Sequence, residues 1–417
     1  MTDELAAALA SRYVFPERAR EYAKKVTERA RAGAYDGRSP DELGERLTSD
    51  LVEWSADKHM RVYFDPEANA QRRAYLAAEA ERSALEEPEP TEPVLDPVAA
   101  SDKFGFHGLQ TLPGNVGYVS LSALYGLEDP RVERELVRVV TALAQTDAVV
   151  IDLRSCWGGH AATGQRLASH FFAEGARLPL CSTHVPADDR VDESWTLETV
   201  AGPRLVDQPV YLLVGPRTLS GAEALSYELQ VLERAQTVGA KTAGAAHAVR
   251  PMPLGDEYMM WIPEVRPLHP YTGKNWEGTG VTPDVEIDPS QAHLLAHLMA
   301  LEELLARAPQ GDAGARAELE WARDLRRAEL SPASVSGELL DEYAGSYSGI
   351  ELRRNGVRLD ARVQDGAWIP LRALDTRTFL PERGAAFRLV FERDERGTIH
   401  AVRRWAPGRP AELLQRR

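Results

Sequence analysis

The stretch Gln208–Val231, with the sequence QPVYLLVGPRTLSGAEALSYELQV, decides how the central part of this chain is expected to fold. It begins with a run of β-prone apolar residues, which is typical of a buried strand. Gly215 and Pro216 indicate a turn, and the residues after Ser220 have the composition of a helix. Ser220 is therefore expected at a strand-to-helix turn, beside backbone N–H groups that have no partner within the helix.

This position gives Ser220 two alternative roles. Free N–H groups and the positive end of a helix dipole suit an anion that forms next to the serine oxygen, as a nucleophilic serine requires. Serine is also a common helix N-cap, and capping alone would explain its place. The stretch by itself leaves both roles open.

Length and composition restrict the class of protein. A chain of 417 residues suggests two or three domains, and its 43% hydrophobic content is enough for sizeable cores. The net charge of −15 argues against nucleic acid or an anionic membrane as a partner. No apolar span of about 18 residues predicts a transmembrane helix. The N-terminal residues lack the pattern of a signal peptide, so a cytoplasmic location is expected.

Cysteine usage argues against a metal centre. Cys156 and Cys181 are the two cysteines, and they form neither a CxxC motif nor a Cys–His pattern with metal-ligand spacing. The two could pair, but a reduced pair fits the cytosol better. We therefore expect neither a metal nor another cofactor.

The N-terminal part predicts a helical module over residues 1–76. Apolar residues recur at helical spacing, and the segment Asp57–Phe64 becomes β-prone directly after His59. Residues 77–100 are rich in Glu, Pro and Ala, and the stretch Leu85–Pro90 predicts a solvated linker.

Strand and helix patterns alternate over residues 101–290, which predicts an α/β core. The stretch Ala148–Leu153 is continuously apolar, as expected of a parallel strand that is covered on both faces. Residues 291–335 predict a helical connector. Short alternating segments over residues 336–417 predict a small antiparallel β domain without obvious chemistry.

Four segments of the core carry the candidate chemistry. Each either follows an apolar strand pattern or is rich in glycine, and in order they are Asp152–Gly159, Thr218–Glu223, Val238–Gly244 and Asn275–Asp284. In the first, the Gly158–Gly159 pair could form an anion-binding nest or only a plain turn.

Taken in this order, the four segments resemble the tail-specific (C-terminal-processing) serine peptidases. The similar branch is the one that contains the tricorn core peptidase and the interphotoreceptor retinoid-binding protein repeats. The resemblance covers roughly residues 4–290 and includes Tyr13–Pro16, Asp57–His59 and Leu112–Tyr118. It implies a core of ββα units related to the crotonase and Clp-type peptidase folds. It also implies acyl transfer through Ser220, with a peptide or protein as substrate.

One departure decides between the branches of this family. Peptidases of the Ser–Lys type carry their base lysine after a Thr-Phe-Gly run, whereas this chain has Ala245 at that place. Lys241 comes four residues too early, so a Ser–Lys dyad is not expected.

The tricorn-like branch takes its base from an N-terminal histidine, and His59 matches that segment. Histidine suits the role because its unperturbed pKa is near ~6.5. Through the pattern Glu-x-x-Gly-Val-x-Pro-Asp, Glu277 matches the carboxylate that orients the base. His59 could instead be structural, and Glu277 a solvated loop acid. Lys58 stands where the tricorn peptidase has a serine, so the sequence leaves open whether Lys58 joins the relay as a fourth member.

Several other positions complete the predicted site. His247 is an alternative base, because the retinoid-binding-like branch often has a histidine in this loop. The oxyanion hole is assigned to the N–H groups of Gly221 and of Gly158 or Gly159, and losing one such donor typically costs ~3 kcal/mol. For Trp157 and Trp276, apolar packing is expected rather than a role in the substrate groove.

The resulting prediction is a cytoplasmic serine peptidase in which Ser220 is the nucleophile, His59 the base and Glu277 the orienting carboxylate. Three alternatives stay open: a non-catalytic protein that binds apolar ligands, a crotonase-like acyl-thioester enzyme, and a peptide ligase or cyclase. A PDZ module is not expected, because roughly 25 residues separate the helical module from the core. A homo-oligomer is neither predicted nor excluded.

Overall fold

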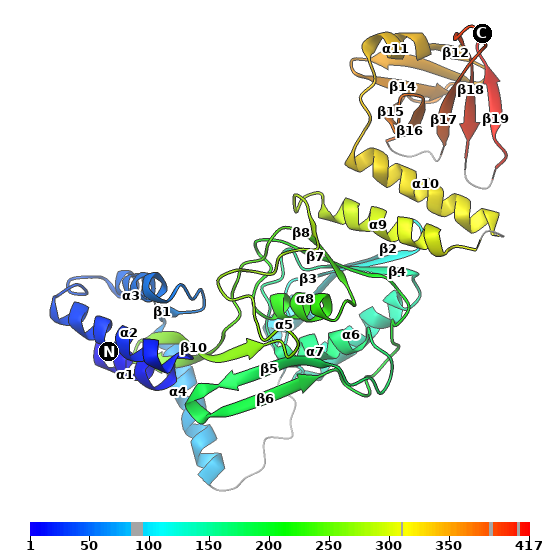
Figure 1. The fold of residues 1–417 in the computed structure, drawn as a ribbon. Coiled ribbons are helices and arrows are strands. Elements are labelled where there is room, and N and C mark those ends of the chain that lie inside the picture. Colours follow the sequence, from blue (N-terminus) through cyan, green and yellow to red (C-terminus); the bar gives the residue numbers. More distant parts are fainter. Residues whose placement is uncertain (85–94, 310–311, 383–386, 407–408) are drawn as a thin grey trace. The chain divides into compact units, whose positions relative to one another are not determined.

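The computed structural model describes residues 1–84, 95–309, 312–382, 387–406 and 409–417 (Figure 1). The chain divides into two compact units, each assembled from several segments. The first unit comprises Met1–Leu109, Tyr118–Gln145 and Ile151–Pro289. The second unit comprises Gln110–Gly117, Thr146–Val150 and Ser290–Arg417. Among these residues, none of the helices is long and apolar enough to cross a membrane.

The first unit begins with three helices, α1 (Thr2–Arg12), α2 (Pro16–Arg31) and α3 (Pro40–Ser55). Ser39 caps α3, because its hydroxyl accepts from the Glu42 N–H while the Glu42 carboxylate accepts from the Ser39 N–H. Leucines of α1 and α3 share one core, which includes Leu5, Leu9, Leu47 and Leu51. This packing matches the helical periodicity of the sequence.

Helix α4 (Pro66–Ala84) extends into the predicted linker. The residues 77–84 at its C-terminal end are mainly Ala, Glu and Arg, which are strong helix formers. The start of the predicted linker at residue 77 is therefore helical, and the stretch Leu85–Pro90 lies outside the described residues.

A five-stranded sheet holds the N-terminal part of the first unit together. Its strand order is β1-β10-β5-β6, and β9 also pairs with β10. The strands are β1 (Arg61–Phe64), β5 (Pro179–Val185), β6 (Arg190–Trp195), β9 (Ala248–Leu254) and β10 (Tyr258–Leu268). Both β1 and β9 run antiparallel to β10, and Trp261 of β10 pairs with Arg61 on one side and Pro251 on the other. The residues that precede β1 and β9 therefore lie at the same end of the sheet.

A second sheet carries the elements around Ser220. Its order is β11-β8-β7-β4-β3-β2. The strands are β2 (Phe106–Leu112), β3 (Val116–Leu121), β4 (Ala148–Asp152), β7 (Val210–Val214), β8 (Gln236–Gly239) and β11 (Val285–Glu286). Every residue of β4 and β7 is buried, which explains their continuous apolar sequence. The associated helices are α6 (Pro130–Leu143), α7 (Ala161–Ser169) and α8 (Gly221–Val231). Short helices also occur at α5 (Pro97–Ser101), η1 (Lys103–Gly105) and η2 (Pro186–Asp188).

The second unit contains α9 (Ala292–Arg307), α10 (Ala313–Leu330), α11 (Gly337–Tyr343) and an eight-stranded antiparallel sheet. Its strands pair in sequence order: β12 (Gly345–Tyr347), β13 (Ile350–Asn355), β14 (Arg358–Val363), β15 (Ile369–Ala373), β16 (Thr378–Pro381), β17 (Arg388–Arg393), β18 (Ile399–Trp405) and β19 (Glu412–Gln415). The rings of Tyr343 and Phe391 stack in its core with centroids 3.8 Å apart. The predicted mixed α/β class with a C-terminal antiparallel β region is confirmed. The crotonase-type spiral and the domain boundaries stay predictions.

Candidate active site

Ser220 lies at the turn between β7 and α8, as the sequence predicts, and its backbone is strained. Its φ is 52° and its ψ is −120°, a region that non-glycine residues rarely occupy. Such a conformation costs on the order of 1–3 kcal/mol and persists where the surroundings enforce it. A serine that served only as an N-cap would normally have extended backbone angles. The strain therefore favours a functional role for Ser220.

Glu223 holds this turn in place. Its carboxylate is fully buried and accepts four hydrogen bonds. The donors are the Ser220 N–H (2.9 Å), the Thr242 hydroxyl (2.5 Å), the Gly244 N–H (2.6 Å) and the Ala245 N–H (2.9 Å). Burial raises the pKa of Glu223, while these hydrogen bonds act in the opposite direction. Glu223 thus fastens the serine turn to the loop that follows β8.

The glycines predicted for the oxyanion hole surround Ser220. A β-carbon on Gly158 would lie 2.6 Å from the Gly221 nitrogen, and one on Gly221 would lie 2.8 Å from the Gly159 oxygen. The φ angles of Gly158 and Gly159 are 90° and 127°. The two turns therefore contact each other so closely that only glycine fits.

The N–H groups of these glycines differ in their partners. Within the described parts of the chain, the N–H groups of Gly159 and Gly221 donate no hydrogen bond. The Gly158 N–H is directed to the thiol of Cys156. Burial raises the pKa of that thiol to about 11, so Cys156 is an unreactive wall residue. Two free donors thus lie beside the serine.

His59 lies just before β1, in a turn that Asp57 stabilises. The left-handed residue Ala56, with φ 57°, ends α3, and the Asp57 carboxylate then accepts a hydrogen bond of 3.0 Å from the His59 N–H. The Nδ1 atom of His59 is buried and has no hydrogen-bond partner. Burial lowers the pKa of His59 below its usual 6.5. His59 is therefore neutral at neutral pH.

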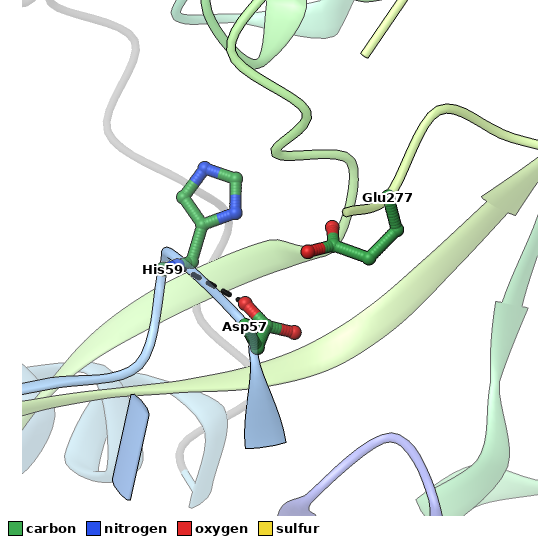
Figure 2. Close-up of side chains that lie close together, drawn as sticks. All are labelled: Asp57, His59 and Glu277. Atoms are coloured by element: carbon green, nitrogen blue, oxygen red, sulfur yellow. Dashed lines mark hydrogen bonds between the residues drawn. The ribbon is translucent and has the colours of Figure 1, made fainter. Parts of the chain in front are cut away.

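Glu277 approaches His59 from the glycine-rich loop before β11. Its Oε2 accepts from the N–H groups of Ala246 (2.6 Å) and His247 (3.0 Å), whereas its Oε1 is buried without a partner. Burial raises the pKa of this carboxyl group. Figure 2 shows the carboxylate pointing toward Asp57 and His59, and the nearest polar atoms of the three side chains all lie within 4.8 Å of one another. The structure thus brings together the predicted base and the predicted carboxylate.

The alternative base His247 is paired with Asp57, which was not among the predicted site residues. Its Nδ1 lies 2.6 Å from Asp57 Oδ2 and 3.6 Å from Glu277 Oε2, and the side chains of His247 and Asp57 are only 4% and 2% exposed. The Phe15 ring packs edge-on against the imidazole at 5.4 Å. The one signal in the sequence that could have identified Asp57 is its position two residues before His59, since acidic residues are common at helix ends.

The histidine segment and the serine turn meet at one loop. The Lys58 ammonium group donates to the Ala243 carbonyl, and the next two residues of this loop donate to Glu223. Among the described hydrogen bonds, none joins the Ser220 hydroxyl to His59 or His247. The structure thus relates the candidate base to the serine through this loop rather than by direct contact.

The two tryptophans near the site differ from each other. Trp276 is 4% exposed, and its indole donates to the Ala245 carbonyl, in agreement with the predicted packing role. Trp157 is 53% exposed, so packing does not account for it. Its ring contacts Tyr125 edge-on at 6.3 Å. The predicted packing role is wrong for Trp157, because the turn that leads into Gly158 directs its side chain to the surface.

A strained serine beside free backbone donors is an arrangement that suits a nucleophilic serine. Residues 115–287 match the model of peptidase family S41, and this range includes the serine turn, the glycine turn and the loops with His247 and Glu277. The protein is a serine-type peptidase. The matched segment belongs to the tail-specific peptidases of family S41, so the family predicted from the sequence is confirmed. His59 lies outside the matched range.

Solved structures similar to this chain include several proteases. A proposed peptidase from Parabacteroides merdae ATCC 43184 is 18% identical, with a TM-score of 0.48 over 69% of this chain and 88% of its own. The photosystem II D1 C-terminal processing protease is 15% identical, with a TM-score of 0.42 over 70% of this chain and 94% of its own. The tricorn protease is 14% identical, with a TM-score of 0.45 over 78% of this chain and 36% of its own. The family assignment relies on the match over residues 115–287.

Proposed function

We propose that the protein hydrolyses peptide bonds through an acyl-enzyme on Ser220, with His59 as general base and Glu277 as its orienting carboxylate. One observation carries this assignment of roles: His59 Nδ1 and Glu277 Oε1 are both buried and unpartnered, and they belong to the same cluster. His59 Nδ1 can donate a hydrogen bond and Glu277 Oε1 can accept it, so a small movement of the two side chains toward each other would pair them. Catalytic hydrogen bonds are often long before substrate binds.

The steps follow from this pairing. The Ser220 hydroxyl attacks the carbonyl carbon while His59 Nε2 takes its proton, and the ionised Glu277 stabilises the imidazolium that forms. The free N–H groups of Gly221 and Gly159 hold the oxyanion. His59 then gives the proton to the leaving amine, and the C–N bond breaks. A water molecule, deprotonated by His59, then attacks the ester carbonyl. The bond between the acyl carbon and Ser220 Oγ breaks, His59 returns the proton to this oxygen, and the acid is released.

A second arrangement has its own support in the structure. Asp57 and His247 are already 2.6 Å apart, which is the contact that the orienting acid and the base make in a catalytic triad. In this arrangement His247 would deprotonate Ser220. The burial of His247 argues against it, because the base must reach both the serine and the substrate.

Labelling with a fluorophosphonate tests the nucleophile, and two histidine variants test the base. Wild type should be labelled on Ser220 and should cleave members of a peptide library, whereas Ser220→Ala should do neither. His59→Ala should abolish labelling, and His247→Ala should retain it in part. The reverse result for the two histidines would move the base to His247.

The same experiment separates the other classes of function. Unlabelled wild type that binds apolar ligands would support a binding protein, and thioester turnover that survives Ser220→Ala would support a crotonase-like enzyme. A ligase or cyclase would give joined products when an amine is added. A cytoplasmic location is part of the proposal, and the free state of Cys156 and Cys181 is compatible with a reducing compartment.

A further inference from the structure

The cluster of Asp57, His59 and Glu277 has the composition of a metal site. It offers one imidazole nitrogen and two carboxylates, and the candidate ligand atoms lie within 4.8 Å of one another (Figure 2). This ligand set suits divalent ions of the zinc type, which accept nitrogen and oxygen donors and often leave one position open. Sequence motifs for metal sites consist of ligands that lie close together in the chain. They therefore do not detect three ligands that are spread over positions 57 to 277.

Two unsatisfied atoms leave coordination capacity within this cluster before any closure pairs them. His59 Nδ1 and Glu277 Oε1 are both buried and unpartnered, although buried polar atoms nearly always have a partner. A zinc ion bonded at about 2.1 Å to three ligands would hold them roughly 3.4 Å apart. Small side-chain rotations would bring atoms that now lie within 4.8 Å to that separation.

Charge also favours a cation at this place. Two carboxylates, Asp57 and Glu277, lie next to each other with little exposure, and His247 is the basic group in contact with both. A divalent cation would compensate the same charge more completely. It would also compete with His247 for the Asp57 carboxylate.

We propose that Asp57, His59 and Glu277 form an inhibitory site for a divalent cation of the zinc class. The inhibitory effect rests on the proposed function, because a cation on His59 and Glu277 would occupy the base and its orienting carboxylate. The binding itself does not depend on that function. The cation is an inhibitor that competes with proton transfer, not a cofactor of the reaction.

Calorimetric titration of the Ser220→Ala protein with ZnCl2 tests the site, because this variant keeps all three ligands. One zinc ion per site is expected, and Co²⁺ should give the visible absorption of a low-coordinate complex. Glu277→Gln, which is nearly isosteric, and His59→Ala should each weaken zinc binding by at least tenfold. His247→Ala should strengthen binding, because it frees Asp57.

The surface pair of His107 and Asp102, whose side chains lie 3.0 Å apart, provides the matched control. His107→Ala should leave the titration unchanged. Absence of zinc binding, or binding that survives both Glu277→Gln and His59→Ala, would overturn the site, and so would binding that His107→Ala removes. Circular dichroism of each variant would show that the fold is intact.

Activity then separates this proposal from the proposed function. Zinc should inhibit wild-type peptidase activity reversibly, and EDTA should restore it. If wild type cleaves no peptide but the titration behaves as expected, the metal site stands and the proposed function fails. If wild type cleaves peptides and saturating zinc leaves the rate unchanged, the inhibitory site fails and the peptidase stands.

Discussion

Two carboxylates with little exposure, one in each unit, differ in how completely their oxygens are hydrogen-bonded. In the second unit, Asp324 is 2% exposed, and both of its oxygens bind guanidinium groups, those of Arg323 at 2.7 Å and Arg388 at 2.6 Å. In the first unit, Glu277 has one oxygen without a partner, and the nearby His59 has a buried nitrogen in the same condition. The first arrangement is complete, whereas the second leaves room for something to bind or move.

The difference separates a structural role from a functional one. A fully paired buried charge is costly to break but does nothing further. An unpaired buried polar atom costs stability and calls for an explanation, which a functional role or a bound ligand can provide. We therefore expect substitutions of Glu277 or His59 to lower activity and leave stability unchanged. Substitution of Asp324 should lower stability and leave activity unchanged.

The largest effect is expected from Ser220→Ala. Loss of the nucleophile should lower kcat by at least about 10⁴-fold, with little change in the melting temperature. Ser226→Ala is the matched control, because Ser226 lies in the same helix and only donates to the Ala222 carbonyl at 2.8 Å. Steady-state kinetics with a cleaved library peptide would measure both variants. Comparable activity in wild type and Ser220→Ala would remove the serine from the mechanism.

The second-largest loss of activity is expected from Glu277→Gln. The amide cannot stabilise an imidazolium as a carboxylate does, so kcat should fall by roughly 10²- to 10⁴-fold. Stability should be unchanged or slightly higher, because a buried charge with an unpaired oxygen is removed. Parallel kinetics and thermal melts would check this pair of outcomes. A large loss of stability would make Glu277 structural, like Asp324.

Asp324→Ala should show the opposite pattern. Removal of this carboxylate leaves two partly exposed guanidinium groups without their partner, which should lower the free energy of unfolding by roughly 2 kcal/mol. Peptidase activity per folded molecule should stay within about twofold of wild type. Urea unfolding and active-site titration would provide the two numbers. Loss of activity at unchanged stability would contradict the assignment.

His297, a buried histidine with a hydrogen-bond partner, should make the stability of the protein depend on pH. Burial lowers the pKa of His297 to about 4, and its Nε2 lies 2.8 Å from the Pro113 carbonyl in the second unit. The unfolded state, with a pKa near ~6.5, gains the proton first. Stability from this group is therefore present above pH 6.5 and is lost as the pH falls toward 4, by roughly 3 kcal/mol in total. Urea unfolding between pH 7 and 4 should show this slope in wild type and a shallower one in His297→Leu. Equal slopes would exclude His297 as the cause.

The smallest effect is expected from Lys58→Met. The variant keeps the apolar stem but loses the hydrogen bond to the Ala243 carbonyl, which helps to hold the His59 segment near the serine loop. Because Lys58 is exposed, we expect kcat/KM to fall by at most about tenfold. Kinetics at two salt concentrations would measure the effect. A loss as large as that of Ser220→Ala would make Lys58 part of the proton relay.

Much of the fold follows from local sequence. The strands β4 and β7 are continuous apolar runs, and α8 begins where the Gly215–Pro216 turn predicts. The end of α4 was harder to place, because its Ala- and Glu-rich sequence suits both a helix and a solvated linker. A local sequence pattern fixes the end of such a helix only where a Pro or Gly marks it. Here the next proline is Pro88, which comes after the last residue of α4.

The candidate site is only partly predictable. Ser220 and its glycines stand out because turn chemistry constrains them locally. The pairing of Asp57 with His247 spans 190 positions and depends on the register of β1 and β9 along β10, which no local pattern encodes. The strained backbone of Ser220 is equally invisible in the sequence, because such a conformation persists only where the folded surroundings enforce it.

The position of β10 between β1 and β9 has a consequence for the newborn protein. Chain synthesis produces the His59 segment early, but the strand that positions it, and Glu277 just beyond, emerge from the ribosome only after Ser220 has already appeared. Under the proposed mechanism, an incomplete polypeptide would therefore carry Ser220 without Glu277 and without the strand that positions His59. Under that mechanism, peptidase activity could arise only after synthesis has passed Glu277, about two thirds of the way along the 417 residues.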